Sequence, residues 1–409
     1  MKKIRSIGKW LVITLLVALF SGLSSALFLF LLEFAGKSRS ENHWFYLTLP
    51  FFGLFIVYLY DKWSPDAHGG YNLVLSEIFD PKKTLSKWMS PLVLIGTLLT
   101  HLGGGSAGRE GTAVQMGASL SDLLNQPFSL SKEERKRLLK MGIAGGFAAV
   151  FGTPLAASVF AIEVLRNKGR KLPDILFIAL TAHLANFICH LTTISHTDYH
   201  FNVPIPYSAD FLFWLFLSAV FFGLVSLIYI FLSNFFKQKS TIFFPNPYLR
   251  IFIGGSLISM FFLSSNLDHL SGLGVQTIVS SFSVPTLNFD FAFKILLTTF
   301  TLGVGFKGGE VTPLFFIGAT LANLLSFWIP LPLPIIVSCG FVSVFGASTK
   351  TPYASSVMGA EIFGWEYFLI FLVSCYISSS VSGNQSVYSA QMKDRLWWQV
   401  NFVNWLTSK

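Results

Sequence analysis

Apolar runs, many of them too short to cross a lipid bilayer, most constrain what this chain can fold into. A transmembrane helix needs roughly 20 consecutive apolar residues, and several runs here are shorter or are interrupted by Gly or Pro. Transporters use such short, broken segments to line an ion site at mid-membrane depth. The predicted apolar segments are 10–32, 45–60, 91–101, 142–165, 175–191, 211–236, 251–264, 291–304, 314–330 and 367–381.

The overall composition supports the same class. Hydrophobic residues make up 53% of the chain and charged residues only 12%, and the mean hydropathy is +0.61. These values exclude an ordinary soluble globular domain. We therefore predict an all-α polytopic membrane protein with many tilted and broken helices, surrounded by the lipid bilayer.

The basic residues are interpreted as topology signals and not as a nucleic-acid site. The net charge is +9, but the basic side chains form short clusters beside the apolar runs, without interleaved aromatic residues. Such clusters mark the cytoplasmic side, and we expect a multi-pass protein of the cell inner (plasma) membrane with a cytoplasmic N-terminus. The clusters are Lys2, Lys3, Arg5 and Lys9; Lys132, Arg135, Lys136, Arg137 and Lys140; and Arg166, Lys168, Arg170 and Lys171.

Catalytic and cofactor motifs do not stand out in the chain. The three cysteines, Cys189, Cys339 and Cys375, lie in or beside apolar runs without CxxC spacing, which predicts neither a disulfide framework nor a metal site. The chain contains no HExxH and no Walker loop. We expect no cofactor, no metal and no enzymatic activity.

Two glutamates occur in nearly the same local sequence inside this apolar chain. Glu110 lies in Gly108-Arg-Glu-Gly-Thr112 and Glu310 in Gly308-Gly-Glu-Val-Thr312, and each segment leads into an apolar run that closes with Gly-Ala-Ser/Thr-Leu. A carboxylate at lipid depth is costly and therefore indicates a functional site. The preceding glycines break the chain, so the amides that start the next helix are open to a ligand.

A second pair of segments repeats in the same order. Residues 147–152 match 341–346, and after Pro154 and Pro352 the same offsets carry Glu163 and Glu361. This order predicts an internal duplication, with residues 1–236 and 248–409 as the two halves of the transmembrane domain and 237–247 as a polar connection. Basic clusters flank only the first copy of this segment, which indicates an inverted-topology repeat.

At these motifs the chain resembles the CLC family of chloride channels and anion/proton antiporters over nearly its whole length. Gly108-Arg-Glu-Gly-Thr112 is similar to the G-K/R-E-G-P motif of the family, and Gly309-Glu-Val-Thr-Pro313 stands in place of its G-x-F-x-P motif. Thr112 and the pair Val311-Thr312 are similar to the bacterial branch that exports fluoride in exchange for protons. The resemblance implies a homodimer and, for this length, no soluble regulatory domain.

The resemblance also implies the site residues. Glu110 takes the place of the gating and proton-carrying carboxylate. The segment Asn384-Gln-Ser-Val-Tyr388 resembles the late segment that supplies a tyrosine hydroxyl to the anion. The residues implied to bind the anion are Gly70, Tyr71, Asn72, Gly108, Arg109, Gly111, Val311, Thr312 and Tyr388.

Two positions depart from the family pattern. The G-S-G-I-P motif supplies a serine hydroxyl in chloride carriers, but Gly69-Gly-Tyr-Asn-Leu73 stands there, so Tyr71 or Asn72 must replace the serine. Chloride/proton members carry a second glutamate as internal proton acceptor after the segment that begins at Pro154, whereas this chain has Val164. A proton must then use Glu110 alone, or water.

Simpler interpretations remain open for several of these residues. Glu310 is expected to cap a helix start, and Glu163 and Glu361 to accept hydrogen bonds from backbone amides. Thr312 is either an anion donor or bonded to a preceding carbonyl, and Tyr388 is either an anion donor or an interfacial tyrosine. Glu110 itself could form a surface ion pair with Arg109 at a helix start.

The favoured function is a secondary active transporter that exports fluoride in exchange for protons, with Glu110 as its gate. Half-helix amides together with Tyr and Thr hydroxyls can replace the water around a small anion without a full cation. The alternative is a chloride channel or chloride/proton antiporter on the same fold. A membrane-embedded enzyme with paired carboxylates is the least favoured class, because no Asp/Glu pair lies at a suitable short spacing in an apolar run.

Overall fold

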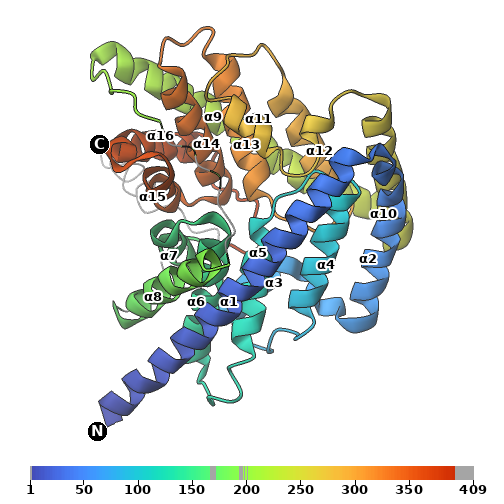
Figure 1. Ribbon diagram of the computed structural model, residues 1–409, viewed down its shortest axis with the longest axis vertical. Coiled ribbons are helices and arrows are strands. Elements are labelled where there is room, and N and C mark those ends of the chain that lie inside the picture. Colours follow the sequence, from blue (N-terminus) through green and yellow to red (C-terminus); the bar gives the residue numbers. More distant parts are fainter. Residues whose placement is uncertain (1, 166–171, 193–196, 198, 200, 392–409) are drawn as a thin grey trace, which may run out of the picture.

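The computed structural model describes residues 2–165, 172–192, 197, 199 and 201–391. The third basic cluster, at 166–171, lies outside these residues. The described part is all-α, as predicted, with sixteen α-helices and no strand (Figure 1). The helices before residue 191 are α1 (Lys2–Glu41), α2 (Leu49–Trp63), α3 (Gly70–Phe79), α4 (Met89–Leu102), α5 (Glu110–Asp122), α6 (Lys132–Phe151), α7 (Pro154–Glu163) and α8 (Leu172–His190).

The remaining helices follow the same order of long and short elements. Four short 3-10 helices lie in the connections, at His43–Thr48, Pro65–Gly69, Asp268–Leu270 and Trp365–Tyr367. The helices after residue 208 are α9 (Ala209–Phe243), α10 (Pro247–Ser264), α11 (Val275–Ser280), α12 (Asp290–Gly303), α13 (Val311–Leu325), α14 (Leu333–Thr349), α15 (Pro352–Phe363) and α16 (Phe368–Val381).

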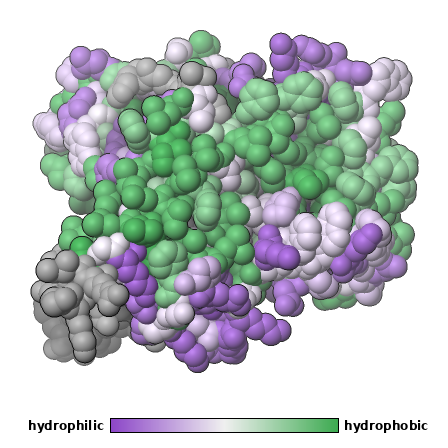
Figure 2. All heavy atoms as spheres, turned by 60° about the horizontal axis from the view of Figure 1, so that its bottom comes forward, coloured by the Kyte–Doolittle hydropathy of each residue, from purple (hydrophilic) through white to green (hydrophobic). Residues whose placement is uncertain are grey.

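Four helical segments in the described chain are long and apolar enough to cross a membrane by themselves. They are Ile7–Glu41, His43–Trp63, Ala209–Phe243 and Pro247–Ser264. Figure 2 shows a broad apolar band across one face of the molecule, with polar residues gathered above and below it. This distribution is that of a multi-pass membrane protein.

Glycine and proline produce the short helices that the sequence predicts. Gly152 ends α6 in the left-handed conformation with φ of 77°, and Pro154 occupies the first position of α7. The equivalent break between α14 and α15 uses Lys350, also left-handed with φ of 58°, followed by Pro352. Proline cannot continue a helix but fits its first turn. The α6/α7 break and the α14/α15 break therefore lie at equivalent positions of the two repeated segments.

Close helix contacts repeat between the two halves. In α5, a Cβ on Gly117 would lie 2.2 Å from the Gly142 carbonyl oxygen of α6, and in α13 a Cβ on Gly318 would lie 2.0 Å from the Gly340 carbonyl oxygen of α14. Only glycine permits such an approach of two membrane helices. The pairs α5/α6 and α13/α14 therefore pack in the same way.

The helices α7 and α15 cap each other. The Glu361 carboxylate accepts hydrogen bonds from the amides of Leu155 and Ala156 at the start of α7, at 2.9 and 2.7 Å. The Glu163 carboxylate accepts from the amides of Tyr353 and Ala354 at the start of α15, at 3.1 and 2.7 Å. These bonds agree with the structural role expected for both glutamates. Each helix caps the start of the other, as two elements related by a two-fold axis would do.

The predicted polar connection is mostly helical. Residues 237–243 form the last turns of α9, so only residues 244–246 separate α9 from α10. The division of the chain at 237–247 stays a prediction. The order of elements also fits a second copy that starts at α9, because α9 and α10 precede the short helices as α1 and α2 do.

Candidate ion-transport site

The two glutamate loops meet through their backbones. The Gly108 amide donates to the Gly309 carbonyl at 2.6 Å, and the Gly309 amide donates to the Gly108 carbonyl at 2.7 Å. A Cβ on Gly309 would lie 2.6 Å from the Gly111 amide nitrogen, which explains why glycine is needed at this contact. The pairing brings the starts of α5 and α13 to one place, although they are far apart in the sequence.

Glu110 is buried at this junction, with none of its surface exposed. Its carboxylate accepts hydrogen bonds from the Arg109 amide at 3.1 Å, from the Thr312 amide at 3.0 Å and from the Thr312 hydroxyl. The Arg109 Nε lies 3.6 Å from Glu110 Oε1. The first glutamate is therefore bound at the start of α13, where helix amides attract negative charge, and a simple surface ion pair is excluded.

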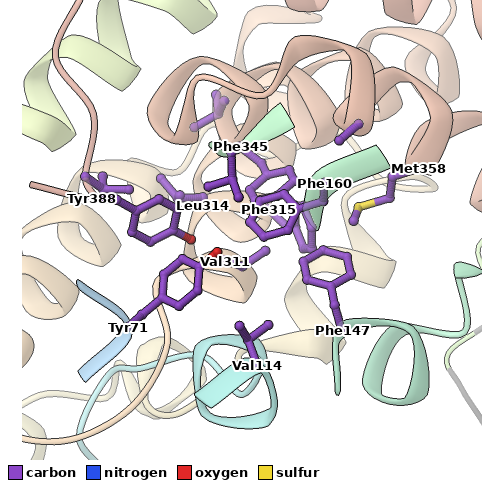
Figure 3. Close-up of a cluster of buried hydrophobic side chains, with 14 of the residues drawn as sticks. Tyr71, Val114, Phe147, Phe160, Val311, Leu314, Phe315, Phe345, Met358 and Tyr388 are labelled. Carbon is purple, nitrogen blue, oxygen red and sulfur yellow. The ribbon is translucent and has the colours of Figure 1, made fainter. Parts of the chain in front are cut away.

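Two tyrosines from opposite ends of the chain lie together beside this junction. The rings of Tyr71 and Tyr388 meet edge to face, with centroids 4.8 Å apart, and both are buried. Their hydroxyl groups point toward each other next to Val311 (Figure 3), and the Tyr71 hydroxyl has no hydrogen-bond partner among the described residues. A buried hydroxyl without a partner is costly, and here it remains available to a ligand.

The structure separates the roles of Tyr71 and Asn72. The Asn72 Oδ1 accepts a hydrogen bond from the Ala390 amide at 2.9 Å, so this side chain holds the C-terminal segment against α3. Gly70 starts α3 with φ of 56°, a conformation that favours glycine. The Tyr71 hydroxyl, rather than the Asn72 side chain, is the unpartnered donor that meets Tyr388.

Two cavities adjoin the glutamate loops. The large cavity, of about 480 Å³, is lined by Gly70, Tyr71, Asn72, Gly111, Tyr388 and Glu310, and further out by Asp61, His68, Lys237, Arg250 and Lys307. The small cavity, of about 30 Å³, is lined by Arg109, Glu110, Thr312, Tyr199 and Phe341 among others. Among the described residues none lines both: Glu110 and Thr312 line the small cavity, and the adjacent loop residues Gly111 and Glu310 line the large one.

Glu310 does not cap α13, which corrects the expectation from its sequence. It occupies the position before the helix, but its side chain makes no capping hydrogen bond, and its buried Oε2 has no partner among the described residues. The carboxyl group lines the large cavity instead. A cap requires the side chain to turn back onto its own helix, and here the start of α13 is already occupied by Glu110.

The remaining predicted residues take structural positions around the site. The Thr112 hydroxyl pairs with the Thr97 hydroxyl of α4 at 2.7 Å. Gly108 carries the loop pairing, and Val311 is buried under the two tyrosines. Lys307 was not among the predicted site residues, although a lysine between two apolar runs is itself a signal of function.

A buried carboxylate held by the start of a broken membrane helix, in a loop region that two cavities adjoin, is the arrangement of an ion transporter. Residues 51–383 match the family model described as voltage gated chloride channel. The chain therefore belongs to the voltage-gated chloride channel (CLC) family, and it is an anion transporter of that family. Members of this family are transporters or channels and not enzymes.

Relatives and solved structures agree with this assignment. A chloride/fluoride channel protein of Pseudomonas syringae pv. tomato is 41% identical over 396 residues, which cover 94% of this chain and 86% of the relative. The crystal structure of a CLC-type fluoride/proton antiporter superposes with a TM-score of 0.90 at 32% identity, covering 93% of this chain and 96% of the other. A slow cyanobacterial Cl⁻/H⁺ antiporter shares the fold, with a TM-score of 0.82 at 20% identity over 93% and 96% of the two chains.

Proposed function

We propose that the protein exports fluoride in exchange for protons, with Glu110 as gate and proton carrier. The observation that carries this proposal is the bound Glu110 carboxylate, which takes the amide and hydroxyl of Thr312 as a free anion would. The relative named for chloride and fluoride and the solved fluoride/proton antiporter support the choice of substrate.

Exchange follows from competition for one set of donors. An ionised Glu110 occupies the start of α13 and closes the path between the cavities. Protonation removes the charge that the helix start and Arg109 attract, so the neutral carboxyl group leaves and an anion can take the donors. Because one proton is taken up whenever the gate opens, movement of the anion is linked to movement of the proton.

The anion would meet hydroxyl donors on its way. Tyr71 and Tyr388 supply two phenol groups beside Val311, and Thr312 supplies the third hydroxyl once Glu110 has left. Fluoride is a compact, strongly hydrated acceptor, and its entry depends on donors that replace its water. This set of donors favours fluoride over a larger halide.

The proton has a second acidic group within the site. Val164 stands where chloride/proton members carry their internal glutamate, but Glu310 presents a carboxyl group to the large cavity. We propose that a proton from Glu110 reaches the large cavity through water and Glu310. The basic residues Lys237, Arg250 and Lys307 indicate that this cavity faces the cytoplasm.

We also propose the homodimeric assembly that the family resemblance implies and the orientation that the basic clusters indicate. The N-terminus of α1 would lie on the cytoplasmic side of a bacterial inner membrane, and two copies of the chain would form a homodimer. Large apolar side chains are exposed on neighbouring helices α7, α8, α15 and α16, among them Leu155, Leu176, Phe187, Tyr353 and Leu369. Such a surface suits either lipid or a second copy.

Anion efflux from proteoliposomes tests the proposal. Vesicles would be loaded with fluoride or with chloride, and the pH would be recorded on both sides. We expect fluoride efflux to drive proton uptake against a pH gradient. If chloride is carried at least as fast as fluoride, the proposal fails, and the alternative function, a chloride channel or chloride/proton antiporter, takes its place.

A further inference from the structure

Lys307 places an ammonium group in the wall of the large cavity. It lies in the loop between α12 and α13, and its aliphatic stem crosses Gly96 of α4, where an added Cβ would approach Lys307 Cγ to 2.9 Å. Its Nζ lies 4.4 Å from the centre of the Tyr60 ring. The ammonium is thus fixed by packing against α2 and α4 and directed into the cavity.

No carboxylate of the described residues forms an ion pair with Lys307. The nearest acceptor is His68, whose Nδ1 lies 3.4 Å from Lys307 Nζ. The other nitrogen of that ring, Nε2, lies 3.1 Å from Asp61 Oδ1. Asp61 can only accept, so Nε2 carries the proton and Nδ1 accepts from Lys307. One weak acceptor leaves the remaining donors of the ammonium open toward the cavity.

The surroundings of this pair are positive. Arg250 from α10 and Lys237 from α9 line the same cavity, whereas the acidic side chains that line it are Asp61, which pairs with His68, and Glu310, deeper inside. The Tyr60 ring lies against His68, with the centroids 4.9 Å apart and the ring planes tilted by 41°. A cationic cavity with low-dielectric walls concentrates anions, and an ammonium in it without an acidic partner lacks the counter-ion that desolvated charges need.

We propose that Lys307 and His68 form a proton-linked binding site for a monovalent halide ion at the mouth of the large cavity, outside the tyrosine pair. With His68 neutral, the ammonium shares one proton with the imidazole. When His68 takes a proton, Nδ1 becomes a donor, Lys307 is released from it, and both groups face the ion. The site loads the anion before it reaches Tyr71. Only the identity of the ion rests on the proposed function.

The concentration of fluoride that gives half-maximal efflux tests the site. Lys307→Met keeps the apolar stem against Gly96 and removes the charge, so we expect this concentration to rise about tenfold, the effect of losing one charge-assisted hydrogen bond. The maximal rate and the number of protons exchanged per ion should stay unchanged. Lys307→Arg should remain close to wild type, and so should Lys239→Met, because Lys239 is exposed outside the cavity.

His68 predicts a pH dependence with a defined sign. Burial and the neighbouring Lys307 lower the pKa of His68. Protonation adds positive charge, so the half-maximal concentration should fall as the pH falls below the ordinary range of histidine. In His68→Gln this pH dependence should be reduced relative to wild type. The charged groups facing His68 are Asp61, Lys307 and Arg250. The pH dependence of the half-maximal concentration is also measured in Lys307→Met, where it should be smaller than in wild type.

The outcomes separate this proposal from the transport function. An unchanged half-maximal concentration in Lys307→Met, or an equal increase in Lys239→Met, would overturn the site. If Lys307→Met does not fold, Lys307→Cys treated with a positively charged and with a negatively charged thiol reagent makes the same test, with opposite shifts expected. If the wild type carries chloride and no fluoride, the proposed function fails, and the same comparison in chloride still decides the site.

Discussion

The two glutamate loops have nearly the same sequence and opposite environments. Glu110 receives three hydrogen bonds, two of them from Thr312 of the other loop, whereas the Oε2 of Glu310 is buried without a partner beside the large cavity. The two threonines differ in the same way. Thr112 pairs with Thr97 of α4, while in α12 Thr298 pairs with Ser106, so that Thr312 is left for Glu110. The two repeated loops therefore share a backbone arrangement but differ in their hydroxyl pairs. Because Thr312 has no hydroxyl partner like that of Thr112 among the described residues, it bonds Glu110 instead.

Among the variants that test the difference between the two glutamates, Glu110→Gln should have the largest effect on proton transport. An amide cannot titrate, so we expect fluoride-driven proton movement to be lost entirely, while the single carbonyl oxygen of Gln can still accept one of the two Thr312 bonds. Proton uptake into fluoride-loaded proteoliposomes measures this. Proton pumping at close to the wild-type rate would remove Glu110 from the proton path.

Thr312→Val and Thr112→Val form a matched pair across the two halves. Each removes one hydroxyl, but only Thr312 bonds the gate. We expect Thr312→Val to weaken fluoride transport by about 1.5 to 3 kcal/mol, or about tenfold or more in affinity, the scale of a hydrogen bond to a charged group. Thr112→Val should leave the fluoride concentration for half-maximal efflux unchanged. Equal effects of the two variants would contradict the asymmetry described above.

Glu310→Gln tests whether the second glutamate carries protons without holding the gate. We expect the proton-coupled rate to fall several-fold with little change in half-maximal fluoride concentration, because Glu310 makes no bond to the donors that the anion would use. Efflux of fluoride and uptake of protons, measured in the same vesicles, give both quantities. A variant that transports both ions at wild-type rates would show that water alone serves the proton.

Glu163→Gln and Glu361→Gln should have the smallest effect on transport and nearly equal effects on stability. Each replaces a helix cap whose loss costs about 0.5 to 2 kcal/mol, and the two caps are reciprocal. Thermal unfolding in detergent should give similar shifts, with the ratio of fluoride to protons unchanged. A large difference between the two shifts would mean that the exchange of caps is not energetically symmetric.

Much of the architecture could be predicted from local sequence. The apolar runs, the helix breaks at Pro154 and Pro352 and the equal register of Glu163 and Glu361 were all legible as patterns. The helical end of α9 could not be predicted, because residues 237–241 are polar and their composition suggested a connection. Charged residues do not prevent a helix from continuing when its other turns pack against neighbours.

The roles of neighbouring residues were the least predictable part of the site. Tyr71 and Asn72 both lie in the first turn of α3, and the sequence left the choice between them open. The choice follows from the C-terminal segment, because the Ala390 amide binds Asn72 and Tyr388 meets Tyr71. Successive residues on a helix point in different directions, so the orientation of α3 against the C-terminal segment assigns their roles.

The sequence by itself determined that two carboxylates would lie in glycine-rich breaks between apolar helices, because glycine, proline and hydrophobicity act on the chain locally. Only the tertiary structure decided which carboxylate is bound. The Glu110 side chain and its donors on Thr312 are 202 positions apart, and hydrogen bonds form only when groups approach to about 3 Å. The backbone pairing of Gly108 with Gly309 provides that approach, and no local pattern specifies which of two similar glutamates will benefit from it.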